Sequence, residues 1–429
     1  MIFLKGLLVK YLPSKFLLVN DLDINSFINY NDTMNPHLNL LQPYPFERLR
    51  QLFANVTPNP AFANINLSIG EPKHATPTLI KNALIDNLNG LAIYPTTLGV
   101  LPLREAIANW ATRRYAIPLL NAQTEILPVI GSREALFAIA QVVINSSKTD
   151  PIVICPNPFY QIYEGATLLA GATPYFLNTT PENGYAMDFA SVPVDVLNRT
   201  QLVYVCSPGN PSGKVMTLSQ WRDIFELSEK YGFVIAADEC YSEIYFNEND
   251  QPLGALQAAH LLGRNLSNLI VFGSLSKRSN VPGMRSGFVA GDEKIIAKFL
   301  LYRTYHGSAM NPSIQMASIA AWNDEAHVIE NRRLYAQKFE TVTPLLTDVF
   351  DVKMPDAAFY LWAKIKDKAI SDTDFALKLY RDLNITVLPG SLLARQAHGT
   401  NPGAGFIRLA LVASLEECLE AAKRIQLHL

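Results

Sequence analysis

Between about residue 125 and residue 290, short apolar runs alternate with segments whose apolar residues recur at helical spacing. The apolar runs are PIVIC, ATPYFL, QLVYVC, FVIAAD, NLIVFGS and GFVAG, and two of the helical segments are SREALFAIAQVVI and LSQWRDIFELSEKYG. Nearly continuous apolar strands that alternate with helices are typical of a mainly parallel sheet covered by helices on both faces. The pattern therefore predicts an α/β fold for the middle of the chain.

The later part of the chain has a different pattern, which predicts a second domain. After about residue 312 long helical patterns dominate, with strands expected around FYLWAKI, ITVLPG and FIRLALV, as in a smaller α+β domain. A chain of 429 residues is long enough for two domains. We expect four parts: residues 1–33 as an N-terminal extension outside the fold, 34–75 as an arm that packs with the small domain, 76–322 as the large domain and 323–429 as the small domain.

Composition and charge argue against several classes of partner. The net charge of −2 gives no electrostatic reason to bind nucleic acid or an anionic membrane. The apolar first twenty residues are interrupted by Lys5, Lys10 and Lys15, whereas a membrane span needs about 20 apolar residues in a row. The four cysteines are widely spaced without a CxxC pair, so we expect neither a disulfide framework nor a metal site, and we expect a cytoplasmic location.

Four predicted strands end on polar or conformationally special residues. QLVYVC runs into SPGNP, FVIAAD into ECY, NLIVFG into SLSK and PIVIC into PNPFY. Ligands of open α/β sheets bind at the carboxyl ends of the strands, so these four ends form the candidate site. Nucleotide motifs do not explain it, because the chain has no GxGxxG and GNPSGK at 209–214 is one residue short of a P-loop and is followed by Val215.

The residues at these strand ends suit the cofactor pyridoxal 5'-phosphate (PLP). Such an enzyme needs a nucleophilic lysine, an acid beside the pyridine nitrogen, a donor to the ring oxygen, a phosphate site and a clamp for the substrate carboxylate. Lys277 follows a buried strand, where burial and a neighbouring cation would lower its pKa. Asp238 suits the pyridine nitrogen, and Asn210 and Tyr241 suit the ring oxygen. A helix N-cap, a Gly/Pro turn and a buried structural tyrosine are the ordinary explanations for these last three residues.

Further residues suit the phosphate, the ring face and the substrate. Ser132 is a plausible N-cap at the start of a predicted helix, where free backbone N–H groups bind phosphate. Arg285 can pair with a phosphate through two N–H donors, and Tyr160 can stack on the pyridine ring. Arg408 lies among apolar residues and needs an anionic partner, either a substrate α-carboxylate or a structural acid. Each of these signals is modest alone, and a capped helix, a polar loop or core packing could explain it.

The order of GSREALF, NPFY, SPGNPSG, ADECY and SLSK resembles that of the fold-type-I class I/II aminotransferases, from Met34 to Leu429. The resemblance implies PLP fold type I, with a mainly parallel seven-stranded sheet between helices in a large domain, and a smaller α+β domain. It implies a homodimer, in which Tyr94 reaches the phosphate of the neighbouring subunit, and catalytic roles for Lys277, Asp238 and Tyr241. The residues implied to bind the cofactor are Ser132 and Arg133 (through their backbone), Tyr160, Asn210, Asp238, Tyr241, Ser274, Ser276, Lys277 and Arg285, and those implied to bind substrate are Gly70, Asn210 and Arg408.

A narrower resemblance concerns the substrate. MNPHLNLLQPYPFERLR, LSIGEPKHATP and SLSKRSNVPGMRSGFVAGD resemble segments of the succinyldiaminopimelate aminotransferases of lysine biosynthesis, and this resemblance begins at Met34. It implies amino-group transfer between N-succinyl-L,L-2,6-diaminopimelate and 2-oxoglutarate. The alternatives are another class I/II specificity (aromatic, alanine, methionine or N-acetylornithine type) and a fold-type-I PLP lyase. Basic residues beside the site motifs are candidates for the distal substrate groups: Lys73, Arg278, Arg303 and His306.

Overall fold

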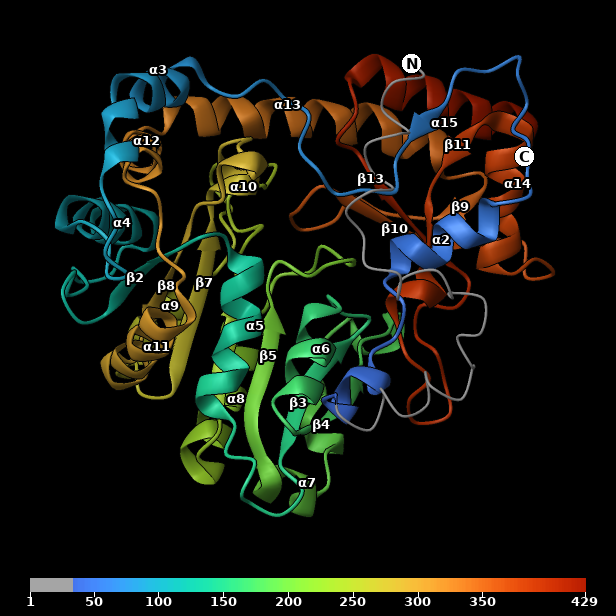
Figure 1. Ribbon diagram of the computed structural model, residues 1–429. Helices are drawn as coiled ribbons and strands as arrows, with labels where there is room; N and C mark the ends of the chain where they lie inside the picture. The colour runs from blue at the N-terminus through green and yellow to red at the C-terminus, as the bar shows by residue number, and fades with distance from the viewer. Residues whose placement is uncertain (1–33) are drawn as a thin grey trace, which may run out of the picture. The chain divides into compact units, whose positions relative to one another are not determined.

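The computed structural model describes residues 34–429, in which residues 43–429 form one compact unit. A 3-10 turn spans Pro36–Leu40 in the short described segment before this unit. The predicted extension, residues 1–33, lies outside the described residues. The sheets and cavities belong to residues 43–429 (Figure 1).

A seven-stranded sheet occupies the middle of the sequence. Its strand order is β2-β8-β7-β6-β5-β3-β4, in which the run from β7 to β4 is parallel and β8 is antiparallel to both of its neighbours. The strands are β2 (Ile126–Val129), β3 (Ile152–Asn157), β4 (Thr173–Asn178), β5 (Thr200–Cys206), β6 (Val234–Asp238), β7 (Leu269–Ser274) and β8 (Gly287–Gly291). The six apolar runs of the sequence correspond to β3 through β8, so the predicted mainly parallel sheet is confirmed.

Both faces of this sheet are buried, as β5 illustrates. Successive strand side chains point to opposite faces. Leu202 and Tyr204 belong to one hydrophobic core, and Val203 and Val205 belong to another. The first core includes residues of α5 (Ser132–Val143), α6 (Ile162–Leu169) and α11 (Glu293–His306). The second includes residues of α4 (Leu101–Tyr115), α8 (Leu218–Tyr231), α9 (Ala255–Leu261) and α12 (Pro312–Asn323).

The boundaries of α8 follow from its sequence. Thr217 accepts a hydrogen bond from the Gln220 amide, while the Gln220 side chain accepts from the Thr217 amide, so two of the unpaired donors at the helix start are satisfied. The helix ends at Gly232, whose φ of 78° is a left-handed conformation that glycine adopts without steric cost. Local residues of this kind fix where a helix begins and ends, and the apolar face fixes where it packs.

A smaller antiparallel sheet lies in the C-terminal part of the chain, with strand order β12-β13-β10-β9. Its strands are β9 (Phe350–Asp351), β10 (Tyr360–Ile365), β12 (Leu388–Pro389) and β13 (Phe406–Ala410). A separate parallel pair joins β1 (Ile65–Asn66) to β11 (Ile385–Thr386), so the segment before the large sheet is hydrogen-bonded to the C-terminal part. The predicted fold class is confirmed, whereas the boundaries at residues 33, 75 and 322 stay predictions.

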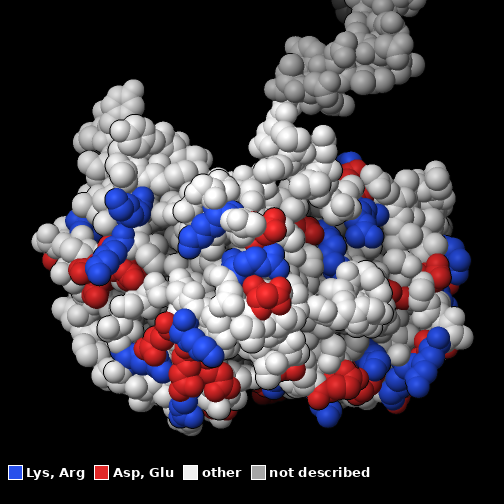
Figure 2. Space-filling view, turned by 90° about the horizontal axis from the view of Figure 1, so that it is seen from below, with Lys and Arg blue, Asp and Glu red and all other residues white. Residues whose placement is uncertain are grey.

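The remaining helices complete the unit. They are α2 (Pro45–Phe53), α3 (Thr78–Asp86), α7 (Val194–Arg199), α10 (Leu275–Arg278), α13 (Ala326–Val342), α14 (Asp372–Leu383) and α15 (Leu415–His428). Among the described helices, none combines the length and the apolar character needed to cross a membrane. On the face shown in Figure 2, basic and acidic side chains are interspersed and form no patch of a single sign.

Candidate active site

A cavity of about 490 Å³ lies where β5, β6 and β7 end. All but one of the site residues predicted from the sequence line it, although they come from segments far apart in the chain. These residues are Gly70, Ser132, Arg133, Tyr160, Asn210, Asp238, Tyr241, Ser274, Ser276, Lys277, Arg285 and Arg408. The exception is Tyr94, whose side chain is 99% exposed on the surface of the chain.

Lys277 projects its amine into this cavity from α10, the short helix that follows β7. Its Nζ donates a hydrogen bond to the carbonyl oxygen of Gly70 at 2.9 Å. Burial lowers the pKa of Lys277 to about 8, and the positive charges of Arg133 and Arg285 act in the same direction. A substantial fraction of this amine is therefore neutral, and nucleophilic, near pH 8.

Asp238 ends β6 and is buried at the base of the cavity. Its carboxylate accepts hydrogen bonds from the Tyr163 hydroxyl at 2.7 Å and from the backbone amide of Cys240 at 3.2 Å. Burial raises the pKa of Asp238, and these hydrogen bonds offset only part of that rise. Both donors are neutral, so this buried carboxylate is bonded to no cation among the described residues. A protonated nitrogen of a ligand could supply the missing positive charge.

Arg285 lies over the start of α5. The N-cap of that helix is Gly131, with a φ of 94°, so the prediction that Ser132 is the N-cap is wrong. A Cβ atom on Gly131 would lie 1.9 Å from Arg285 Nη2, which shows how closely the guanidinium approaches the helix start. The backbone amides at a helix start and a guanidinium are donors that can bind an anion, and both lie together here.

Arg408 projects from β13 and is buried, with 4% of its surface exposed. Its guanidinium donates to Asn210 Oδ1 at 3.0 Å and to the Ser68 carbonyl at 2.7 Å, and it lies 4.3 Å from the ring centre of Tyr360. Its Nε has no hydrogen-bond partner among the described residues. Among the described residues, this arginine is thus paired with neutral acceptors instead of an acid, so its charge suits an anionic ligand.

Tyr360 and Tyr163 are two site residues that the sequence interpretation missed. The Tyr360 hydroxyl lies 2.9 Å from the Tyr241 hydroxyl, and a Cβ atom on Gly70 would lie 2.0 Å from it. Gly70 is thus needed where the chain passes Tyr360. Tyr163 holds Asp238 from the start of α6. The sequence offered one signal for Tyr163, because it lies three residues after Tyr160 in the NPFYQIY segment. The sequence around Tyr360 offered no signal of a site residue.

Two of the basic residues suggested for distal substrate groups are already paired. The Arg278 side chain is 1% exposed and binds Glu325 at 2.6 Å, and the Arg303 side chain is equally buried and binds Glu134 at 2.6 Å. Neither lines the cavity, and neither do Lys73 and His306. A further cation in the cavity lining is Arg133, whose side chain donates from Nε to the Tyr160 hydroxyl at 2.7 Å.

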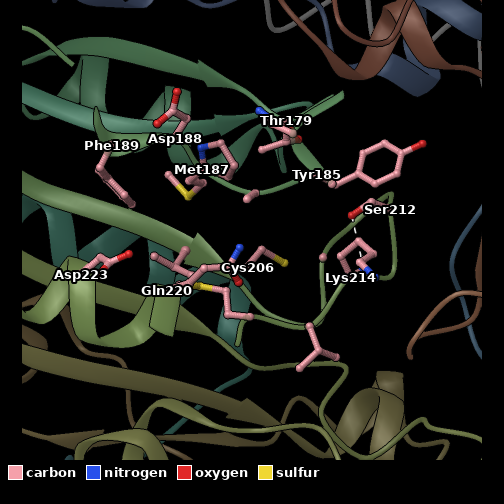
Figure 3. Close-up of a pocket in the computed structure, with 18 of the residues that line it drawn as sticks. Thr179, Tyr185, Met187, Asp188, Phe189, Cys206, Ser212, Lys214, Gln220 and Asp223 are labelled. Atoms are coloured by element: carbon pink, nitrogen blue, oxygen red, sulfur yellow. Dashed lines mark hydrogen bonds between the residues drawn. The ribbon is translucent and has the colours of Figure 1, made fainter. Parts of the chain in front are cut away.

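A second cavity, of about 670 Å³, lies beyond the loop that carries Asn210. Met187, Phe189 and other apolar side chains line much of it, and Figure 3 shows them facing the space near Asp223 and Cys206. Cys206 and Asn210 line both cavities. The larger cavity is lined by neither Lys277 nor the arginines Arg285 and Arg408, so the predicted site residues that carry charge belong to the smaller one.

The model of the family "Aminotransferase class I and II" matches residues 63–425. The chain belongs to this family. Its members depend on pyridoxal phosphate, which confirms the cofactor predicted from the sequence. The matched region contains every described strand, and it contains all the predicted site residues that line the smaller cavity.

Several relatives resemble the chain over most of its length. A crystal structure of an aminotransferase from Neisseria meningitidis is 54% identical, with a TM-score of 0.88, and covers 91% of this chain and 99% of its own. An LL-diaminopimelate aminotransferase from Aquifex aeolicus is 30% identical over 84% of this chain and 90% of its own length. A probable N-succinyldiaminopimelate aminotransferase from Thermus thermophilus is 26% identical, with a TM-score of 0.77, and covers 90% and 99% of the two chains.

The cavity fits pyridoxal phosphate on features of this chain alone. Asp238 is a buried acid that lacks a cationic partner among the described residues, as a protonated pyridine nitrogen would provide. Gly131 leaves room for Arg285 at a helix start, as a phosphate site requires. Lys277 supplies an amine whose pKa is lowered to about 8. These three features belong to one site, and each suits a different part of the cofactor: the pyridine nitrogen, the phosphate and the reactive carbon.

Proposed function

We propose that this protein transfers an amino group between glutamate and N-succinyl-L,L-2,6-diaminopimelate, acting in lysine biosynthesis in the cytoplasm. The observation that supports the reaction class is the Lys277 amine, whose pKa is lowered to about 8. The same cavity is lined by the buried acid Asp238 and by the arginines Arg285 and Arg408. The named relatives that act on diaminopimelate compounds support the substrate class. The long sequence segments noted above support the succinylated form.

Each cofactor contact falls to a residue of the cavity. Arg285, Ser274, Ser276 and the first turn of α5 would hold the phosphate, with Ser132 and Arg133 contributing backbone amides. Asp238 would keep the pyridine nitrogen protonated. Asn210 and Tyr241 would donate to the ring oxygen, and Tyr160 would stack on the ring.

When bound, pyridoxal phosphate withdraws electrons from the substrate α-carbon, so that its proton becomes removable. The Nζ atom of Lys277, as a neutral amine, would accept that proton and release it again in a later step. Positioned bases of this kind contribute about 10²–10⁴-fold to rate. Arg408 binds the substrate α-carboxylate and so aims the α-carbon at Lys277. Gly70 lets the chain pass close to Tyr360, and its place in the cavity lining suits contact with the substrate.

A basic side chain in the cavity lining favours an acidic substrate tail. Arg133 lines the cavity and donates from Nε to the Tyr160 hydroxyl, and its Nη groups make no hydrogen bond to the described residues. A guanidinium matches a carboxylate geometrically, and both glutamate and a diaminopimelate derivative carry a second carboxylate. Tyrosine and alanine lack that group, which argues against the aromatic and alanine specificities.

A second candidate substrate is free L,L-diaminopimelate. The relative from Aquifex aeolicus carries that substrate in its name. Glu71 also lines the cavity, and its carboxylate suits the distal ammonium of the free compound, which succinylation would remove. The two candidates thus differ in the charge of one group, so that a direct comparison separates them.

We also propose that the protein is a homodimer in which Tyr94 completes the partner's phosphate site. Tyr94 is 99% exposed, and its neighbours Leu91 and Ile93 are 69% and 65% exposed. A run of exposed apolar side chains around a tyrosine is typical of a surface that a partner covers. The proposed role of Tyr94 requires that this partner is a second copy of the same chain.

A substrate panel tests the proposed function. Protein saturated with pyridoxal phosphate is mixed separately with N-succinyl-L,L-2,6-diaminopimelate, free L,L-diaminopimelate, N-acetylornithine, aspartate, tyrosine and alanine, and the loss of the visible absorption band is timed. We expect the succinylated compound to react fastest. Faster reaction of the free compound would favour the second candidate, and faster reaction of tyrosine or alanine would refute both. A colourless preparation that added cofactor does not restore would refute the use of the cofactor.

A further inference from the structure

The backbone at Lys277 is held by one buried side chain from α13. Asn331 donates from Nδ2 to the carbonyl of Lys277 at 3.3 Å and lies 3.5 Å from that of Arg278. Its Oδ1 accepts from Asn280 Nδ2 at 3.0 Å and lies 2.7 Å from Nδ1 of His74. Asn331 is 2% exposed, so these four partners use the full hydrogen-bonding capacity of its amide.

These contacts determine the protonation state of His74. Backbone carbonyls only accept, so Asn331 must turn its nitrogen to them and its oxygen to His74. His74 Nδ1 therefore carries a hydrogen. Its Nε2 lies 2.7 Å from Lys338 Nζ, and an ammonium group only donates, so Nε2 accepts. His74 is neutral in this arrangement, in agreement with a pKa lowered by burial and by Lys338, against the opposing charge of Glu330.

The loop that carries His74 also holds the other end of the Lys277 side chain. Gly70 accepts the hydrogen bond from Lys277 Nζ at 2.9 Å, and Thr76 donates to the carbonyl of Asn280 at 3.1 Å. One loop thus fixes the amine directly and fixes the backbone through His74 and Asn331. The result is a closed ring of contacts around the one side chain that must move a proton.

The anchor lies on a helix that extends well away from Lys277. Figure 1 shows α13 as a long orange helix whose labelled neighbours include α10 and α15. Farther along α13, Tyr335 and Phe339 belong to the core that also contains β10 and β13 residues. Asn331 therefore connects the Lys277 turn to the packing of the smaller sheet.

We propose that Asn331 and His74 are positioning residues, which hold Lys277 at the place from which its amine reaches the substrate α-carbon. The proposal rests on the proton-transfer role given to Lys277 under the proposed function. Small misplacements of a reacting group slow the reaction while leaving substrate binding nearly intact, because orientation matters most in the transition state. Neither residue touches the cofactor site itself, and each acts through Lys277.

Asn331→Ala tests the proposal, with Arg332→Gln as the matched control. Arg332 is the next residue on α13, is also buried, and bonds to Glu248 at 2.6 Å, without a hydrogen bond to Lys277 or Arg278. For Asn331→Ala we expect kcat to fall on the order of 10- to 100-fold, with the KM for glutamate within about threefold of wild type. The isotope effect on kcat with α-deuterated glutamate should rise, because proton transfer becomes slower than the other steps.

A second readout does not depend on turnover. The pH midpoint of the visible absorption change of the cofactor-loaded protein reports the proton affinity at the Lys277 nitrogen. We expect Asn331→Ala to move this midpoint by about half a pH unit or more. Arg332→Gln should lower the melting temperature while leaving the midpoint and the isotope effect at their wild-type values.

A pair of His74 variants covers the case in which Asn331→Ala does not fold. His74→Asn places an amide N–H where Nδ1–H was, so we expect kcat within about threefold of wild type, while His74→Leu should behave like Asn331→Ala. Wild-type isotope effects and midpoints in both Asn331→Ala and His74→Leu would overturn the proposal. Failure of wild type to react with glutamate would refute the proposed reaction instead, and the absorption midpoints would still decide the roles of Asn331 and His74.

Discussion

Replacing Gly131 by alanine should weaken binding of the cofactor phosphate, because the added methyl group occupies the place of Arg285. The Cβ atom would lie 1.9 Å from Nη2 and 2.6 Å from Cζ of Arg285, so the guanidinium must leave its position at the start of α5. A hydrogen bond to a charged group contributes about 1.5–3 kcal/mol, and 1.4 kcal/mol is a factor of ten in affinity. Loss of one such bond predicts a cofactor Kd that rises roughly 10- to 100-fold.

The same substitution also strains the backbone, so a control must separate the two effects. Gly131 has a φ of 94°, and a side chain in that region costs about 1–3 kcal/mol. Gly232 also has a positive φ, of 78°, but a Cβ there would meet nothing within 4 Å, and its replacement costs about 1–2 kcal/mol. Melting temperatures measured without cofactor report the strain, and absorbance titration with pyridoxal phosphate reports the Kd. If Gly131→Ala loses stability but binds the cofactor as tightly as Gly232→Ala does, Arg285 does not hold the phosphate.

Four further predictions concern the site. Lys277→Ala should retain the cofactor without a covalent bond yet lose amino transfer by at least about 10²-fold; a turnover assay beside an absorbance spectrum checks both, and near wild-type turnover would contradict the role of Lys277. Arg408→Met should lower kcat/KM for glutamate roughly 10²-fold, whereas kcat/KM for an amine that lacks an α-carboxylate should fall much less; steady-state assays with both substrates check this. In protein freed of cofactor, the rate of Lys277 acylation should increase about tenfold per pH unit below pH 8 and level off above it, because burial lowers the pKa of Lys277 to about 8 and only the neutral amine reacts. Peptide mass spectrometry measures this rate, and a rate that levels off only above pH 10 would refute the pKa shift. Mixing inactive Tyr94→Phe and Lys277→Ala chains should restore part of the activity, since each mixed dimer contains one intact site; no recovery after confirmed chain exchange would exclude a role across subunits.

The large sheet could be predicted because its strands are buried on both faces and are therefore apolar almost throughout. The exception is β2, which no apolar run indicated. It has four residues, includes Pro128, and lies at the edge of the sheet beside β8. Proline cannot donate to a neighbouring strand, so it is common in edge strands, and its presence weakens the sequence signal of a strand. In the C-terminal part of the chain, ITVLPG contains two strands: β11 pairs with β1, and β12 belongs to the small sheet.

The site could be predicted where a residue's chemistry is unusual for its position. Lys277, Asp238 and Arg408 are charged residues within or at the end of apolar segments, and that contrast is visible in the sequence. Contacts between distant residues are not visible in this way. Arg278 resembled a free cation because its partner Glu325 is 47 positions away, and Tyr360 resembled an ordinary core residue although it meets Tyr241 across 119 positions.

The bond between Arg408 and Asn210 joins the arginine proposed for the substrate to the amide proposed for the cofactor ring. An amino acid that draws the guanidinium toward its carboxylate also changes the electrostatic environment of that amide. Linkage then requires reciprocity: if a bound carboxylate alters the affinity for the ring, the ring alters the affinity for the carboxylate by the same factor. Through Arg408 and Asn210, binding of the substrate carboxylate and binding of the cofactor ring would thus be energetically coupled, so that each ligand changes the affinity for the other before any proton is transferred.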